Sequence, residues 1–217
     1  LAQIIPSSAL FLKLKEKYNL VVIEDAAHAI EAEYKGKKIG NIGDMTAFSF
    51  YVTKNITTGE GGMVVTDNKE YADKIKMMAL HGMSKDAWKR FSDEGYKHYE
   101  VVFPGFKYNM MDIQASLGIH QLKRLEQYHE HRKMIWDFYN KELNGLGIEL
   151  PSYEGGDIKH VMHLYTVLVD EEKSGISRDK FMQELHKKGI GTGVHYNPVH
   201  LHKYYRDTYG YKTGDFQ

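Results

Sequence analysis

The chain has 217 residues, of which 42% are apolar and 12% aromatic, and it contains no cysteine. Lysine plus arginine balance aspartate plus glutamate at 29 each, so no overall charge favours nucleic acid or an anionic membrane as a partner. The lack of cysteine excludes disulfides and thiol catalysis. Neither a membrane-length apolar run nor a signal-peptide pattern occurs, so we expect a cytoplasmic protein that meets small molecules or other subunits.

The first half of the chain alternates predicted helices and short predicted strands. Leucines at helical spacing predict a helix over residues 7–18, and the apolar run over 19–25 predicts a buried strand. Two further strands are predicted over 45–51 and 62–67, followed by a helix over 68–82. This alternation is typical of an α/β layer structure with a mostly parallel or mixed sheet.

The second half predicts one long helix and a smaller β-α-β unit. The aromatic and charged residues 83–108 show no regular pattern, and we expect them to cover a site or to meet a partner. A helical pattern then runs from about residue 110 to 143. Beyond it, strands are predicted over 163–170 and 190–196, and a helix over 177–189 between them.

Polar residues mark the starts of these later helices. The predicted N-caps are Asn68, Asn109 and Ser177, whose side chains can accept hydrogen bonds from the first turn. The long helix is expected to carry the chain from one domain to another. We therefore expect part of a large α/β domain over residues 1–128 and, over 129–217, the linking helix and part of a small α+β domain.

An aspartate and a lysine lie where two predicted strands end. Asp25 closes the first apolar run, and Lys54 comes three residues after the strand at 45–51. Ligands of open α/β sheets collect at the carboxyl ends of the strands, so both side chains are expected to face one ligand. A partly buried lysine amine can attack a carbonyl to form a Schiff base, and an aspartate can keep the ring nitrogen of pyridoxal phosphate protonated. The alternative is an Asp25 that caps a turn and a solvated Lys54.

The glycine-rich sequence TTGEGG at 57–62 follows Lys54 closely. No Gly-Lys-Ser or Gly-Lys-Thr follows it, and it lacks the dinucleotide-binding spacing of three glycines before a helix, so it is neither a P-loop nor a Rossmann fingerprint. A tight turn between two strands explains it without a ligand, because glycine tolerates positive φ.

Three segments together resemble one family of enzymes. They are VVIEDAAHAIEAEYKGKKIGNIGDMTAFSFYVTKNITTGEGGMVVTD, HGMSKDAW and PGFKYNMMDIQASLGIHQL. They resemble the DegT/DnrJ/EryC1/StrS family of sugar-nucleotide aminotransferases, which use pyridoxal 5'-phosphate (PLP) on the fold type I scaffold. The resemblance runs from about residue 19 to 205 and keeps the family's order and spacing of motifs. It implies transfer of an amino group from L-glutamate to a keto-deoxysugar nucleotide, with 4-keto favoured, in the synthesis of cell-surface polysaccharide or glycan precursors.

The resemblance also implies roles for individual residues. Lys54 would form the Schiff base with the cofactor and shuttle the proton, and Asp25 would bind the pyridinium nitrogen. Ser49 would hydrogen-bond the cofactor phosphate, and His28, where many members have glutamine, would contact the phenolic oxygen of the ring. Asn109 would reach the cofactor phosphate of a neighbouring subunit, which implies a homodimer with shared active sites; a plain helix cap is the alternative.

Three histidines gather near residue 200, namely His195, His200 and His202. Their spacing matches no common zinc pattern, so we expect no metal site. The family resemblance places the first of them near the sugar nucleotide, which makes His195 the substrate-site candidate and His200 a weaker one. Four aromatic residues are expected at the dimer interface, with stacking on the nucleotide base as the alternative: Trp88, Phe91, Tyr96 and Tyr99.

Two features keep other functions open. Family members carry an upstream segment with a phosphate cup and a ring-stacking residue, and a closing C-terminal segment; this chain shows neither, so we expect a fragment that lacks both. A truncated, inactive fragment is therefore one alternative. A non-catalytic regulatory or interaction protein on the same fold is the other, although an intact Lys54 and Asp25 count against it.

Overall fold

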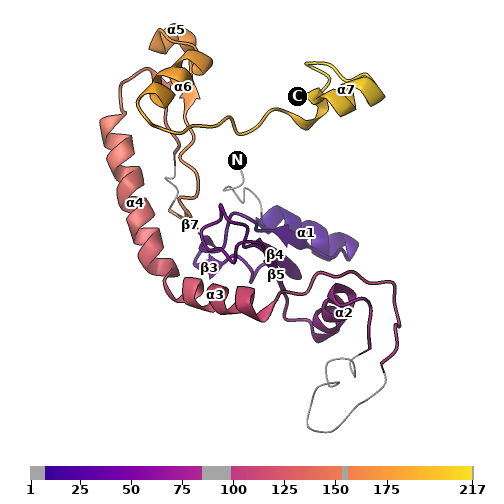
Figure 1. Cartoon of the computed structure of the whole chain (residues 1–217). Helices are drawn as coiled ribbons and strands as arrows, with labels where there is room; N and C mark the ends of the chain where they lie inside the picture. The colour runs from indigo at the N-terminus through magenta and orange to yellow at the C-terminus, as the bar shows by residue number, and fades with distance from the viewer. Residues whose placement is uncertain (1–7, 85–98, 153–155, 217) are drawn as a thin grey trace. The chain divides into compact units, whose positions relative to one another are not determined.

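The computed structural model describes residues 8–84, 99–152 and 156–216, and Figure 1 shows their helices and strands. The chain divides into two compact units, of which the first comprises Leu1–Glu142 and Pro151–Thr166 and the second Leu143–Leu150 and Val167–Gln217. The boundary expected at residue 128 lies inside helix α4 (Leu125–Glu142), and the domain division of the whole protein stays a prediction. None of the described helices is both long and apolar enough to cross a lipid bilayer.

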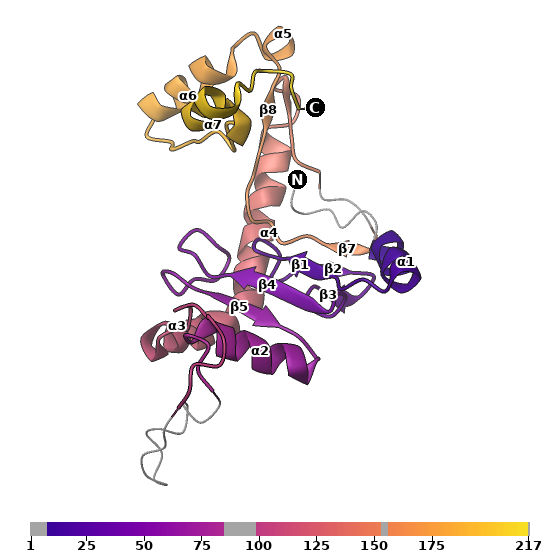
Figure 2. The same cartoon turned by 90° about the vertical axis from the view of Figure 1, so that its right-hand side faces the viewer.

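A mixed three-stranded sheet organises the first unit. Its order is β1 (Ile23–Asp25), β4 (Met45–Ser49) and β5 (Gly62–Val65), with β1 parallel to β4 and β4 antiparallel to β5. All three strands lie within the predicted ranges but are shorter. Figure 2 shows α2 (Lys69–Ala79) and α3 (Asp112–Lys123) on the same side of this sheet.

Strand β1 begins four residues later than predicted because a turn before β4 occupies the backbone ahead of it. The Val22 N–H donates to Asp44 Oδ2 at 2.8 Å, and the Val22 carbonyl accepts from the Asp44 N–H at 2.9 Å. Asp44 also forms an ion pair with Lys15 of α1 (Ser8–Tyr18) at 2.7 Å. These contacts join helix α1 to the start of the sheet.

Helix α2 has the predicted N-cap but ends before Gly82. The Asn68 side chain accepts hydrogen bonds from the backbone of Glu70 and Tyr71, which satisfies donors of the first turn. After Ala79 the chain turns away to pair with residues beyond 100, and the His81 N–H donates to the Phe106 carbonyl at 2.7 Å. A Cβ atom on Gly82 would lie 1.6 Å from the Phe103 carbonyl oxygen, so only glycine fits this close approach.

The long helix predicted over residues 110–143 is two helices. Helix α3 and helix α4 are separated at Arg124, whose φ and ψ are −101° and 2°. The prediction that Asn109 caps this helix is wrong, because the N-cap is Met111 and its N–H donates to Gln114 Oε1 at 3.0 Å. Asn109 therefore lies before the helix, with its side chain released from capping.

A second small sheet in the first unit was not predicted. Its order is β3 (Lys37–Lys38), β2 (Glu33–Tyr34) and β7 (Ile158–Lys159), and both pairings are antiparallel. Lys35 and Gly36 join β2 to β3 with φ values of 51° and 73°. Two consecutive positive φ angles are the geometry of a two-residue type I′ hairpin turn, which favours glycine at the second position.

The second unit combines a two-stranded sheet with short helices. Its elements are β6 (Ile148–Glu149), β8 (Leu168–Val169), α5 (Glu171–Ser174), α6 (Arg178–Lys187), a 3₁₀ turn (Val199–Leu201) and α7 (Lys203–Tyr209). The predicted cap of α6 is confirmed, since the Ser177 hydroxyl accepts from the Lys180 N–H at 3.4 Å. The strand predicted over 190–196 is wrong: this glycine-rich stretch is exposed and irregular.

A small apolar core lies beside the carboxyl end of β4. Phe50, Ile56 and Leu125 form a buried cluster, and Ile30, Phe48 and Met110 pack against it. Two of the buried members, Phe50 and Ile56, flank Lys54 in the sequence. The core therefore anchors the chain on both sides of this lysine.

Candidate active site

Asp25 and Ser49 project from the same face of the first sheet. Asp25 is paired with Ala47 in the β1–β4 ladder, and Ser49 lies two residues beyond Ala47. Because side chains alternate between faces with a period of two, all three share one face. Asp25 is exposed and accepts from the Ala27 N–H at 3.1 Å, and the Ser49 hydroxyl accepts from the Tyr51 N–H at 3.3 Å. The structure thus brings together two of the residues that the resemblance assigned to the cofactor.

Lys54 lies in a loop that its own backbone closes. This Lys54 loop, residues 50–61, leaves β4 and returns to β5. The Phe50 N–H donates to the Gly61 carbonyl at 2.8 Å, the Thr58 N–H donates to the Phe50 carbonyl at 3.0 Å, and the Lys54 N–H donates to the Tyr51 carbonyl at 2.9 Å. The lysine is consequently held in a fixed turn at the carboxyl edge of the sheet.

The glycines of TTGEGG serve this loop as a tight turn. A Cβ atom on Gly61 would lie 2.3 Å from the Thr58 hydroxyl oxygen, and that hydroxyl donates to the Glu60 carbonyl at 2.7 Å. Gly59 has a φ of 81°, which a side chain would strain. The reading of this sequence as a turn between two strands is therefore confirmed.

The Lys54 amine faces a histidine. Lys54 Nζ lies 2.5 Å from His28 Nε2, and both side chains are half-buried. A protonated lysine can only donate, so His28 Nε2 then accepts and the ring proton of a neutral His28 sits on Nδ1. His28 follows β1 in a turn in which the Ala29 N–H donates to the Ala26 carbonyl at 2.9 Å. Two residues that the resemblance assigned to the cofactor are thus in direct contact.

Four polar residues behind this pair were missed by the sequence analysis. The His163 ring lies 4.5 Å from the His28 ring between centroids, and His163 Nδ1 lies 2.6 Å from Asn55 Oδ1. Asn55 Nδ2 donates to Glu31 Oε2 at 2.5 Å, and Arg132 pairs with the other oxygen of Glu31. Only Asn55 stood beside a predicted site residue; the other contacts join distant parts of the chain, and no local pattern indicates them.

Asn109 carries an unsatisfied buried atom. Its Oδ1 is buried and has no hydrogen-bond partner among the described residues. Buried polar atoms almost always find a partner, so Asn109 Oδ1 retains a hydrogen-bonding capacity that none of the described residues uses. The helix-cap alternative for Asn109 is wrong, as the start of α3 shows.

The candidate substrate histidines lie in the second unit. His195 is exposed, and its ring centroid lies 3.8 Å from that of Tyr196. His200 is half-buried, with its ring 4.9 Å from that of Phe216. Within residues 8–84, 99–152 and 156–216, no group of three or more His, Cys, Asp or Glu could hold a metal ion. Of the four expected interface aromatics, Tyr99 is exposed, and the other three lie outside the described residues: Trp88, Phe91 and Tyr96.

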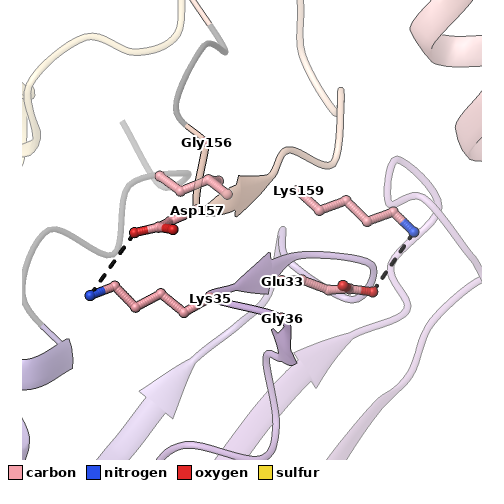
Figure 3. Close-up of a pocket in the computed structure, with 7 residues that line it drawn as sticks. Glu33, Lys35, Gly36, Gly156, Asp157 and Lys159 are labelled. Carbon is pink, nitrogen blue, oxygen red and sulfur yellow. Dashed lines mark ion pairs between the residues drawn. The ribbon is translucent and has the colours of Figure 1, made fainter.

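A shallow pocket of about 340 Å³ lies on the second sheet of the first unit (Figure 3). Its charged groups pair with one another: Lys35 with Asp157 at 4.0 Å, and Lys159 with Glu33 at 3.9 Å. A hydrogen bond from Lys159 to Glu126 at 2.8 Å raises the pKa of Lys159. No predicted site residue lines this pocket, and its charges are already compensated.

Known proteins resemble this chain over most of its length. The model of the DegT/DnrJ/EryC1/StrS aminotransferase family matches residues 9–217. Over 206 residues the chain is 58% identical to the uncharacterised protein MJ1066 of Methanocaldococcus jannaschii and 48% identical to the spore coat polysaccharide biosynthesis protein SpsC of Bacillus subtilis. Each match covers 94% of this chain and 53% of the relative, so the chain spans about half the length of the curated relatives it matches.

A solved structure shares the fold. The Streptococcus pneumoniae protein Spr1654 in its PMP form matches with a TM-score of 0.81 and 33% sequence identity, over 95% of this chain and 57% of that one. The same protein has also been solved in a PLP form. The match confirms the expected fold class, the α/β fold of PLP-dependent type I transferases, and its two forms confirm the cofactor expected for the family.

Proposed function

Since the chain belongs to the DegT/DnrJ/EryC1/StrS aminotransferase family, we propose that its protein is a PLP-dependent aminotransferase that moves an amino group from L-glutamate to a keto-deoxysugar nucleotide. One observation carries the proposal. The Lys54 amine lies 2.5 Å from His28 at the sheet edge where Asp25 and Ser49 share a face. A lysine amine, a ring-facing histidine, a carboxylate and a hydroxyl are the groups that PLP chemistry needs.

The residues present fit the cofactor. The Asp25 carboxylate is exposed beyond β1 and is suited to the pyridinium nitrogen. The Ser49 hydroxyl lies on the same face, one strand away, and is suited to the phosphate. Asn109 Oδ1 is buried and has no partner in residues 8–84, 99–152 and 156–216, which leaves it available to a further group, in keeping with a role across a homodimer interface.

When bound, PLP supplies an electron sink that stabilises charge at the carbon losing a proton. Lys54 would hold the cofactor through Nζ. The same amine would carry a proton from the α-carbon of the amino acid to the aldehyde carbon of the cofactor. His28 would orient that amine, since its Nε2 lies within hydrogen-bond distance of Nζ. Asp25 would favour the protonated ring nitrogen by placing a negative charge beside it.

The substrate assignment rests on the family and on a relative. The name of SpsC refers to spore coat polysaccharide biosynthesis, which supports a role for this chain in polysaccharide or glycan precursor synthesis. A nucleotide-linked 4-keto sugar, the glutamate donor and the homodimer are proposed on the family resemblance alone. His195 is proposed to contact the sugar nucleotide, with His200 as a second candidate.

The test supplies the whole protein with PLP and L-glutamate and measures 2-oxoglutarate. Nucleotide-linked 3-keto and 4-keto deoxysugars are then added, and mass spectrometry detects the amino sugar. We expect 2-oxoglutarate with glutamate alone and an amino sugar only from the 4-keto substrate. Release of 2-oxoglutarate without any amino sugar would overturn the sugar assignment. No release at all would favour the non-catalytic alternative.

A further inference from the structure

A continuous set of contacts runs from the Lys54 amine to a buried carboxylate. Lys54 Nζ lies 2.5 Å from His28 Nε2, and the His28 and His163 ring centroids are 4.5 Å apart, at 56° between planes. His163 Nδ1 lies 2.6 Å from Asn55 Oδ1, and Asn55 Nδ2 donates to Glu31 at 2.5 Å. The mechanism above assigns no role to Asn55 or His163, so it does not explain why the chain makes these contacts.

The amide of Asn55 can point in only one direction. Its Nδ2 donates both to Glu31 Oε2 at 2.5 Å and to the Val161 carbonyl at 3.2 Å, and both of these atoms are acceptors. Rotating the amide by 180° would place its oxygen against a carboxylate oxygen and a carbonyl oxygen. The unflipped amide therefore keeps Oδ1 directed at His163.

This direction determines which nitrogen of His163 carries a proton. An amide oxygen accepts hydrogen bonds and cannot donate them, so His163 Nδ1 must be the donor at 2.6 Å. A neutral His163 is consequently the Nδ1–H tautomer. Which ring nitrogen is protonated is commonly set by the hydrogen bond that one nitrogen makes.

The other end of the set is anchored by charge. Glu31 is 2% exposed, and the Arg132 guanidinium pairs with its Oε1 while Arg132 Nε donates to the Val161 carbonyl at 3.2 Å. Charge-assisted hydrogen bonds of this kind are short and strongly directional. Glu31 and Arg132 thus hold the amide of Asn55 from the side opposite His163.

We propose that Asn55 is a positioning residue of the Lys54 site: it fixes the tautomer and orientation of His163, whose ring holds His28 against the Lys54 amine. The inference rests on the proposed function for the part that concerns Lys54. Asn55 acts through two histidines and does not touch the reacting atoms. A buried polar cluster that serves stability alone would leave the reactivity of Lys54 independent of Asn55.

The first test reads the tautomer directly and needs no activity. The whole protein is labelled with ¹⁵N-histidine, and two-dimensional proton–nitrogen spectra report which ring nitrogen of each histidine is protonated. His163 is assigned by the resonance that a His163→Gln variant lacks. We expect a protonated Nδ1 in the wild type. An unprotonated Nδ1 on His163 would overturn the proposal, and this measurement does not depend on any Asn55 variant folding.

The second test compares Asn55→Ala with Asn140→Ala. Asn140 is a matched control, because its Oδ1 also accepts a hydrogen bond, from the Tyr165 hydroxyl at 2.7 Å. Asn55→Ala should change the His163 tautomer and slow the borohydride-trapped attachment of PLP to Lys54 by about 10- to 100-fold, because misplaced groups react slowly. Asn140→Ala should change neither.

The outcomes separate the two proposals. A changed tautomer in Asn55→Ala with an unchanged rate of attachment would show that Asn55 does not position the amine, and would overturn the inference alone. A wild-type protein whose His163 carries the Nδ1 proton but whose Lys54 never takes up PLP would overturn the proposed function, and the positioning role for Lys54 with it.

Discussion

The Lys54 loop and the segment that carries the candidate substrate histidines, residues 195–202, differ in how the chain holds them. Backbone hydrogen bonds close the Lys54 loop, and its flanking residues Phe50 and Ile56 are 6% and 3% exposed. Residues 191–199 of the second unit are all exposed, and regular hydrogen bonding begins only at the 3₁₀ turn over Val199–Leu201. The geometry therefore supports the role proposed for Lys54, whereas the role proposed for His195 depends on the family resemblance alone.

The two units also differ in how deeply their ion pairs are buried. In the first unit, Glu31 is fully buried and is paired with Arg132 and Asn55. In the second unit the ion pairs are on the surface, as between Arg178 and Asp179, whose side chains are 57% and 71% exposed. Buried pairs are costly to break and exposed pairs contribute little, so the same type of substitution should have different effects in the two units.

The largest expected effect is the loss of activity in Lys54→Ala. Without the amine, no group remains to bind PLP covalently or to carry the proton, so release of 2-oxoglutarate from glutamate should fall to the background rate. Lys69→Ala is the matched control, because Lys69 is an exposed lysine paired with Asp73 on α2. Transamination by Lys54→Ala above background would contradict the assignment.

The next effect is on stability, in Arg132→Leu. The variant leaves the Glu31 carboxylate buried without its cation, which should lower the free energy of unfolding by about 3 to 5 kcal/mol. Arg178→Leu breaks an exposed pair and should change it by less than about 0.5 kcal/mol. Urea denaturation measures the free energy of unfolding of both variants. Equal losses would show that the buried pair contributes no more to stability than the exposed pair.

A third prediction concerns pH and a buried histidine of the first unit. Burial, with a smaller contribution from His129, lowers the pKa of His160 to about 4 from an ordinary value of 6.5. Between these pH values the unfolded chain binds a proton that the folded chain does not, so stability is lost as the pH falls from about 6.5 to about 4. The loss should be on the order of 3 kcal/mol.

The matched comparison for this pH effect uses one histidine from each unit. His160→Asn should flatten the pH dependence of unfolding over that interval, because the titrating group is gone. His186→Asn, which changes an exposed histidine of the second unit, should leave the dependence as in the wild type. Urea denaturation at several pH values between 4 and 6.5 measures the free energy of unfolding. A pH dependence in His160→Asn equal to that of the wild type would show that His160 is not its cause.

The smallest effect is expected in the histidine segment. If His195 contributes one hydrogen bond to the sugar nucleotide, His195→Ala should raise the KM for that substrate about tenfold and leave kcat nearly unchanged. His202→Ala, an exposed neighbour, should leave both unchanged. Steady-state kinetics with varied sugar nucleotide decide the matter, and an unaltered KM in His195→Ala would remove this residue from the substrate site.

The features that could be predicted from the sequence are those with a local cause. Helical periodicity predicted α1, α2 and α6, and the caps Asn68 and Ser177 were read correctly because their hydrogen bonds reach only two or three residues along the chain. The end of the first predicted strand placed Asp25 at the sheet edge for the same reason. The hairpin at Lys35 and Gly36 was missed although its glycine was a usable local signal.

The features that could not be predicted depend on contacts between distant residues. His163 meets Asn55 across 108 positions and Arg132 meets Glu31 across 101, and no periodicity reports such pairs. The break between α3 and α4 at Arg124 lies in a run without proline or glycine. The helical pattern continues across it and therefore predicts a single helix. The strand predicted over 190–196 needed a partner strand, and a β-like composition cannot supply one.

The central claim, that Lys54 is the cofactor lysine, is tested most directly by chemical trapping. The whole protein is mixed with PLP and reduced with borohydride, and the modified peptide is identified by mass spectrometry. We predict a visible absorbance band that reduction removes, with one phosphopyridoxyl group on the peptide containing Lys54. A label spread over exposed lysines such as Lys69, with Lys54 unmodified, would contradict the account.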